Sequence, residues 1–235
     1  MPNWCFNYGT LNLRPNTPKE GHLIFQRLAD EESKDRWFGR VRPCPPEMHL
    51  GLASSQGNEE YMTLEWLEAN SDFQGDFGDF STKFKASAEY EQYLQETFGA
   101  LSWYSWNINN YGCKWDVLAE VTVVSEGALE FSFDSPWGPP IAFFQFLGEM
   151  GLDVTLRYDE PGQEFCGLLS CTEGDVVDDY YEGDEYRVKR LEDGEDIQFL
   201  YWSLEDFETL AEWQEENELP EHPTLAAAIK EYYAE

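Results

Sequence analysis

The sequence predicts an α+β fold in which helices pack on one face of an antiparallel sheet. Three observations support this. An alternating, aromatic-rich first segment is followed by a helix, two strands joined by a tight turn precede a second helix, and two more strands follow that helix. The order strand-helix, strand-strand-helix, strand-strand fits the split βαβ arrangement of a ferredoxin-like core.

The first 46 residues supply the opening strand and helix. Residues 3–14, NWCFNYGTLNLR, alternate and are rich in aromatic and polar side chains, as expected of a strand. Thr17 is placed to cap a helix that begins at Pro18, and its apolar residues run to Leu28. The prolines at 43, 45 and 46 then predict a loop or an extended connector.

The middle of the chain predicts an insertion in the domain. Residues from about 51 to about 100 are polar and irregular, apart from a short helix candidate at Tyr61–Ala69 and a stronger one at Ser87–Leu101. The segment lacks enough apolar surface for a core of its own. We therefore expect a single ferredoxin-like domain over residues 1–172 that contains this helical insertion.

The rest of that domain supplies the remaining strands and the second helix. The predicted elements are strand Leu118–Ser125, strand Ala128–Phe133, helix Ile141–Met150, strand Asp153–Tyr158 and strand Glu164–Ser170. Glu126-Gly127 makes the tight turn between the first two strands. Gly151 stands where a glycine ends a helix.

Beyond Thr172 the chain becomes strongly acidic. The only cations there are Arg187, Lys189, Arg190 and Lys230. We predict that residues 173–235 form an α/β extension packed on the domain, with acidic hairpin-like pieces followed by two helices, Ser203–Asn217 and Pro223–Tyr233.

The net charge of the whole chain, −32 at pH 7, restricts the partners it can have. Aromatic residues make up 16% of the sequence, which argues for a folded protein rather than a disordered acidic chain. Direct binding to nucleic acid or to an anionic membrane needs clustered cations, so neither is expected. Because no apolar run could span a bilayer and no signal pattern is visible, we expect a cytoplasmic protein.

The five cysteines, Cys5, Cys44, Cys113, Cys166 and Cys171, are odd in number and widely spaced. Reduced thiols are therefore expected. A zinc site is the sharper alternative, but the chain has no CxxC pair and no HxxxH. The acids around residue 180 lack the glycine and glutamate spacing of a calcium loop. We predict no metal and no cofactor.

One short motif, residues 109–117 with sequence NNYGCKWDV, has the composition of a site. In a catalytic interpretation Cys113 is a nucleophile, Lys114 lowers its pKa and Asp116 is a base. In a structural interpretation Cys113 and Trp115 fill the core, while Lys114 and Asp116 pair or cap at a strand entrance. None of the three histidines stands in a catalytic signature, so the structural interpretation is favoured.

Carboxylate pairs are the other candidates for catalysis. Glu160 with Glu164, or Asp116 with Glu120, could serve general acid-base or metal chemistry. In a chain with 47 acidic residues such pairs are expected by chance. The sequence therefore predicts no catalytic residue.

Several motifs together resemble a known family. They are Asn3-Trp4-Cys5 with Asn7, Gly112 to Asp116, Trp137 to Pro140, and the hairpin of Tyr158, Glu160, Gly162, Phe165 and Gly167. This pattern resembles the ferredoxin-like domain family of uncharacterised phage and plasmid proteins that includes the YubB-like proteins. The resemblance covers about residues 1–40 and 100–172. It implies the fold and an origin on a mobile element, and it carries no established activity.

The acidic surface remains as the feature with functional content. It could serve only solubility in a high-salt cytoplasm, or it could imitate the phosphate charge of a duplex and occupy a basic groove. The residues predicted to contact such a partner are Asp175, Asp178, Asp179, Tyr180, Tyr181, Glu182, Asp184 and Glu185, with Glu205, Asp206, Glu208, Glu212, Glu215 and Glu216 as a second patch.

We therefore expect a non-enzymatic phage or plasmid protein that binds and inhibits a basic, nucleic-acid-binding host protein, with DNA mimicry against a host defence enzyme as its most specific form. The alternatives are a small enzyme that uses Cys113 or clustered carboxylates, and a structural or assembly protein of a virion. The sequence leaves the oligomeric state open.

Overall fold

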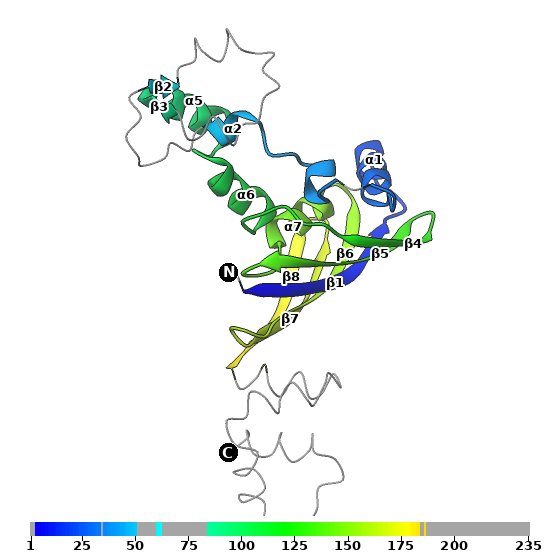
Figure 1. The fold of residues 1–235 in the computed structure, drawn as a ribbon. Helices are drawn as coiled ribbons and strands as arrows, with labels where there is room; N and C mark the ends of the chain where they lie inside the picture. The colour runs from blue at the N-terminus through cyan, green and yellow to red at the C-terminus, as the bar shows by residue number, and fades with distance from the viewer. Residues whose placement is uncertain (1–2, 34, 51–59, 63–83, 184–185, 187–235) are drawn as a thin grey trace, which may run out of the picture.

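A six-stranded antiparallel sheet organises the computed structural model, which describes residues 3–33, 35–50, 60–62, 84–183 and 186. The strand order is β4-β5-β1-β6-β7-β8 (Figure 1). The strands are β1 Trp4–Leu13, β4 Glu120–Ser125, β5 Ala128–Pro136, β6 Leu152–Glu160, β7 Phe165–Thr172 and β8 Asp175–Glu182. The helices are α1 Lys19–Leu28, the 3-10 helix η1 Phe38–Arg40, α2 Glu47–Leu50, α5 Ala88–Phe98, α6 Trp103–Tyr111 and α7 Ile141–Glu149.

Four strands and two helices form the predicted ferredoxin-like core. In chain order they are β1, α1, β4, β5, α7 and β6, and the strands lie in the sheet as β4-β5-β1-β6. The central strand β1 therefore pairs antiparallel with β5 on one side and β6 on the other. This is the split βαβ topology, so the predicted α+β fold class is confirmed.

The hydrophobic core lies mainly between the sheet and helices α1 and α7, which cover the same face of it (Figure 1). Alternation along β6 points Leu152, Val154 and Leu156 into this core. At its centre Trp37 is fully buried, with its ring centroid 5.0 Å from that of Phe131 and 5.8 Å from that of Phe143. An indole buried this way needs a partner for its N–H, which donates to the carbonyl of Leu28 at 3.2 Å.

The start of α1 differs in detail from the prediction. Its N-cap is Pro18, which makes no side-chain cap, and the Thr17 side chain is used elsewhere. The Thr17 hydroxyl donates to the carbonyls of Arg14 and Gly151, at 2.9 and 2.6 Å. Gly151 has φ +94, the left-handed conformation expected after a helix. Thr17 therefore joins the entrance of α1 to the end of α7.

The insertion between α1 and β4 contains a helix that the sequence analysis missed. The helix predicted at 87–101 begins after the N-cap Ser87 but ends at the left-handed Gly99. A new helix, α6, starts after the N-cap Ser102 and includes Asn109, Asn110 and Tyr111, the first residues of the motif at 109–117. Its N-cap Ser102 and its left-handed C-cap Gly112 are residue types that favour helix ends, whereas the aromatic residues of WYSWNINNY are weak helix formers.

The helix predicted at 61–69 lies almost entirely outside the described residues. Residues 61–62 belong instead to β2, Glu60–Met62, which pairs in parallel with β3, Phe84–Ala86. The predicted helices at 203–217 and 223–233 also lie outside the described residues. No helix within the described ranges is long and apolar enough to cross a bilayer.

The first residues of the predicted acidic extension belong to the sheet. β8 pairs with β7 along its whole length, from Phe165 opposite Glu182 to Thr172 opposite Asp175. Residues 175–182 therefore form the strand at one edge of the six-stranded sheet, next to the ferredoxin-like core and β7.

Candidate functional site

The motif around Cys113 forms a structural corner between α6 and β4. Gly112 ends α6 with φ +88, and a Cβ there would lie 2.9 Å from the backbone nitrogen of Ile141. Cys113 follows with only 2% of its surface exposed. Its thiol donates to the carbonyl of Trp115 at 3.2 Å. The glycine and the small cysteine thus allow the chain to turn tightly against α7.

The Cys113 thiol has a raised pKa, whereas the pKa of an activated cysteine nucleophile is lowered. Burial, followed by the negative charge of Asp116, raises the pKa of the thiol to about 12. Lys114 does not offset this, because its ammonium lies over the rings of Trp115 and Tyr104, at 4.5 and 5.9 Å from their centroids. The thiol therefore stays protonated at neutral pH.

Asp116 is a cap for the backbone of η1. Its carboxylate accepts hydrogen bonds from the backbone N–H groups of Phe38 at 2.9 Å, Gly39 at 2.8 Å and Val117 at 2.7 Å. Burial raises the pKa of this carboxyl, while these N–H groups and Arg36 oppose the rise. The expectation that Asp116 caps backbone groups is thus confirmed, and it makes no ion pair with Lys114.

The prediction that Trp115 fills the core is wrong. Its side chain is 37% exposed instead of lying in the core, and its ring centroid is 6.5 Å from that of the exposed Trp4. The core position next to the corner is taken by Tyr111, whose hydroxyl donates to the carbonyl of Arg42. An aromatic pair thus faces outward where the motif meets the first strand.

Members of the predicted carboxylate pairs have other positions or structural roles in the fold. Glu160 is 1% exposed, and its two oxygens accept from the backbone N–H groups of Gly162 and Gln163 in the β6-β7 turn. Glu120 lies at the start of β4, on the face of the sheet away from the helices. Within the described ranges, no group of three or more His, Cys, Asp or Glu side chains could hold a metal ion.

The predicted partner-binding residues on β8 are divided between the two faces of the sheet. Asp178 pairs with the buried Leu169 and so points to the helix side, where it accepts a hydrogen bond from the Tyr158 hydroxyl at 2.8 Å. Tyr180 and Glu182 share this side, and the Tyr180 hydroxyl donates to Glu182 at 2.9 Å. Asp175, Asp179 and Tyr181 point to the opposite side.

The predicted patch is therefore not one continuous surface along β8. The remaining predicted residues, Asp184, Glu185, Glu205, Asp206, Glu208, Glu212, Glu215 and Glu216, lie outside the described residues.

The face of the sheet away from the helices, here called the open face, carries an aromatic stripe. Along β1 the outward residues Trp4, Phe6 and Tyr8 are 43, 49 and 45% exposed. The inward residues between them are Cys5 and Asn7. A row of three exposed aromatics on a central strand is the kind of apolar surface that marks an interaction site.

Carboxylates flank the stripe on both sides. Pairing register and alternation place seven acids on the open face: Glu120 on β4, Glu130 and Asp134 on β5, Asp153 and Asp159 on β6, and Asp175 and Asp179 on β8. The six strands contain a single cation, Arg157. The open face therefore combines exposed aromatic rings with a strongly negative charge.

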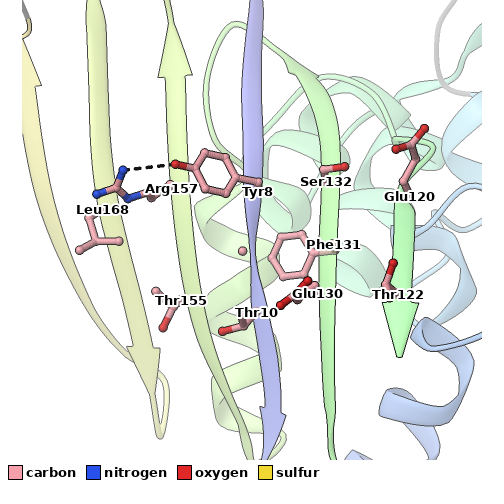
Figure 2. Close-up of a pocket in the computed structure, with 11 residues that line it drawn as sticks. Tyr8, Thr10, Glu120, Thr122, Glu130, Phe131, Ser132, Thr155, Arg157 and Leu168 are labelled. Carbon is pink, nitrogen blue, oxygen red and sulfur yellow. Dashed lines mark hydrogen bonds between the residues drawn. The ribbon is translucent and has the colours of Figure 1, made fainter. Parts of the chain in front are cut away.

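Two hollows lie on this face. The larger, of about 550 Å³, spans the middle of the sheet from Glu120 and Glu130 to Arg157, whose guanidinium donates to the Tyr8 hydroxyl at 3.2 Å (Figure 2). The smaller, of about 410 Å³, is here called the Trp4 hollow. Its lining is Trp4, Arg36, Trp115, Asp116, Val117, Leu118, Asp134 and Pro136.

Sequence reasoning missed this surface because the aromatic residues of β1 were assigned no face. One signal could have found it. Asn7 and Gly9 alternate with the aromatics, and the buried Asn7 amide donates to the carbonyl of Cys5 at 2.7 Å and to the Ser135 hydroxyl at 2.8 Å. Gly9 lies against β6 and Phe131, where a Cβ would meet the Thr155 carbonyl. These small and polar residues face a core already filled by aromatic rings.

One match to a family model supports the class of fold. The family described as "Ferredoxin-like domain in Api92-like protein" matches residues 110–201. The chain is also similar to a crystal structure of a protein api92 from Yersinia pseudotuberculosis. The identity is 13%, the match covers 78% of this chain and 98% of that chain, and the TM-score is 0.40. No curated protein matches this chain.

Proposed function

We propose that this chain is a non-enzymatic binding protein whose open face contacts a basic surface of another protein. The observation that carries the proposal is the composition of that face: its described strands contribute seven carboxylates, the single cation Arg157 and a central stripe of exposed aromatic rings. Arg14, which pairs with Asp153 at 3.5 Å, and Arg36 lie at its margin. Five of the acids, Glu120, Glu130, Asp134, Asp175 and Asp179, have no hydrogen-bond or ion-pair partner among the described residues.

The two components of the face have different roles in binding. Aromatic side chains with little conformational freedom supply most of the affinity at protein interfaces, and here they occupy the middle of the face. Carboxylates around them make charge-assisted hydrogen bonds to arginine and lysine and increase the rate of encounter. The net charge of −32 acts in the same direction, because it steers cationic partners toward the molecule.

The proposal places the first contact patch, which the sequence predicts around residues 175–185, on the open face of the whole sheet. Asp175, Asp179 and Tyr181 remain part of it, because they lie on the open face. Asp178 does not, because the Tyr158 hydroxyl occupies it on the helix side. The acids at 184–185 and 205–216 stay in the proposal as a second patch.

In its most specific form the proposal makes the partner a nucleic-acid-binding host enzyme that this chain blocks by imitating a duplex. The acids of β5 and of β6 are separated by two strand spacings, about 10 Å, with the uncharged β1 between them. Carboxylates held on a rigid sheet on both sides of β1 can pair with cations that line a duplex-binding groove. The β5 side carries most of this charge, because on β6 Arg157 stands between the two acids and Asp153 pairs with Arg14. The resemblance to phage and plasmid proteins fits this use, because a mobile element benefits from blocking a host defence enzyme.

The test compares two variants of equal charge. In the face variant Glu120, Glu130 and Asp134 become Gln, Gln and Asn, and in the control the exposed Glu32, Glu89 and Glu126 become Gln. Each immobilised protein is exposed to host-cell lysate at about 0.15 M salt. Retained proteins are then purified and their affinities for all three proteins are measured.

We expect one basic protein to bind the wild type and the control tightly and the face variant at least about tenfold more weakly. Displacement of that protein by duplex DNA would support mimicry. Equal affinity for both variants would refute the open face as the binding surface and reduce the charge to solubility.

A further inference from the structure

The Trp4 hollow has the composition of a pocket for a cationic side chain. Two of its walls are the rings of Trp4 and Trp115, with centroids 6.5 Å apart and planes inclined by 40°. Both rings remain exposed by roughly two fifths. Because the planes are inclined, the rings form a wedge rather than a face-to-face stack. The Lys114 ammonium already lies 4.5 Å from the Trp115 centroid, so a third group would contact the Trp4 ring and the part of the Trp115 ring that this ammonium does not cover.

The charged groups around the rings differ in how many hydrogen bonds they already make within the molecule. The carboxylate of Asp116 is bound to three backbone N–H groups, and Arg36 donates to the Asp116 carbonyl at 2.6 Å. Asp134 has no hydrogen-bond or ion-pair partner among the described residues. It lies directly opposite Phe6 in the β1-β5 register, next to the pair of Trp4 and Pro136. One carboxylate beside the two rings is thus free to bind a ligand.

The remaining lining is apolar and consists of Val117, Leu118 and Pro136. A side chain that fits this lining has an apolar stem, a flat cationic head and donors that reach a carboxylate. Arginine meets all three requirements, because its guanidinium stacks on aromatic faces and presents a fork of N–H donors. Lysine offers a compact and strongly hydrated ammonium, which loses more solvation in such a pocket.

The molecule itself contains guanidinium groups in comparable settings. Arg42 lies with its guanidinium carbon 4.6 Å from the centroid of the Phe146 ring. On the open face, Arg157 donates to the hydroxyl of Tyr8. The first contact shows an arginine packed on an aromatic ring of this fold, and the second shows an arginine hydrogen-bonded to an aromatic hydroxyl.

We propose that the Trp4 hollow binds an arginine side chain of the basic partner, between the rings of Trp4 and Trp115 and the carboxylate of Asp134. The proposal rests on the proposed function, because it specifies the chemistry of the partner surface that the open face binds. It requires that the preference of the open face for arginine over lysine at equal charge depend on the Trp4 and Trp115 rings, beyond the preference that carboxylates alone give.

The experiment uses the full chain and two synthetic peptides of equal length and charge, oligoarginine and oligolysine. Their dissociation constants are measured by calorimetry at about 0.15 M salt, where long-range attraction is screened. For the wild type we expect oligoarginine to bind about tenfold more tightly. The variant Trp115→Leu is expected to lose this preference while its affinity for oligolysine stays the same.

Two further variants keep the result interpretable. Trp137→Leu removes another exposed tryptophan that does not line the hollow, so it should keep the preference for arginine. Asp134→Asn leaves both rings in place and should lower the affinity for oligoarginine more than that for oligolysine. Circular dichroism spectra show whether each variant is folded. If Trp115→Leu is not folded, the result for Asp134→Asn alone tests the arginine pocket.

The outcomes separate this inference from the proposed function. Equal affinity of the wild type for the two peptides, or a preference that survives both Trp115→Leu and Asp134→Asn, overturns the arginine pocket and leaves the acidic binding surface intact. Failure of the wild type to bind either peptide overturns both proposals.

Discussion

Replacing Asp116 by alanine tests whether the GCKWD motif is a structural corner. The substitution removes the acceptor for the backbone N–H groups of Phe38, Gly39 and Val117, of which Phe38 and Val117 are buried residues. A buried donor left without a partner costs about 1–3 kcal/mol. Because Asp116 itself is only partly buried and water reaches some of these groups, we expect a loss of about 3 kcal/mol in the free energy of unfolding.

The variant Asp116→Asn gives a second value of the free energy of unfolding with which this loss can be compared. Oδ1 of Asp116 accepts from Phe38 and Val117, and Oδ2 accepts from Gly39. An asparagine keeps the first oxygen and places an N–H₂ donor against the Gly39 N–H, so Asp116→Asn should cost about half as much as Asp116→Ala.

Urea titrations followed by far-UV circular dichroism measure both losses, with an unchanged slope as the sign that the unfolded state is the same. The cap would be refuted if Asp116→Ala unfolded within about 0.5 kcal/mol of the wild type, which is the range of an ordinary surface substitution.

Three further predictions concern the sheet and the thiols. Gly167→Ala should destabilise by about 2 kcal/mol in the same titration, because the new Cβ would lie within 3 Å of the Tyr158 ring, and the loss should shrink in a Tyr158→Leu background. Tyr158→Phe should cost about 1 kcal/mol through its lost hydrogen bond to Asp178, and Asp178→Asn should cost less. The Cys113 thiol, with its pKa raised to about 12, should resist a disulfide reagent at about pH 8 and react once guanidinium chloride unfolds the chain; modification of the native protein, identified by peptide mapping, would contradict its burial.

The ferredoxin-like core was predictable because its local signals agree with its packing. In β6 the alternation of Leu152, Val154 and Leu156 with polar residues sets one buried face. In α7 the apolar residues are numerous enough to identify a helix that covers the sheet. Two short turns then connect consecutive strands, so the order of the elements determines most of the topology.

The candidate surface was harder to predict, because in β1 the large aromatic residues face solvent and the small or polar residues face the core. In β1 the aromatic residues Trp4, Phe6 and Tyr8 face outward while Asn7 and Gly9 face the core. The interior there is already occupied by Trp37 and its aromatic neighbours, which come from β5 and α7, so that three separate segments meet. Such competition for core volume is a property of the assembled fold, and its only local mark in the strand is the alternation of Asn7 and Gly9 with the aromatic residues.

The acids that flank the aromatic stripe also affect how copies of this chain meet one another. An uncovered sheet face with three exposed aromatic rings would ordinarily favour self-association, since two such faces can bury each other. Here every approach of two open faces brings two sets of seven carboxylates together, and that repulsion falls as salt shortens the screening length from about 8 Å at physiological ionic strength to about 3 Å at 1 M. We therefore expect these carboxylates to disfavour the pairing of two open faces at low salt, and we expect self-association to increase as the salt concentration rises.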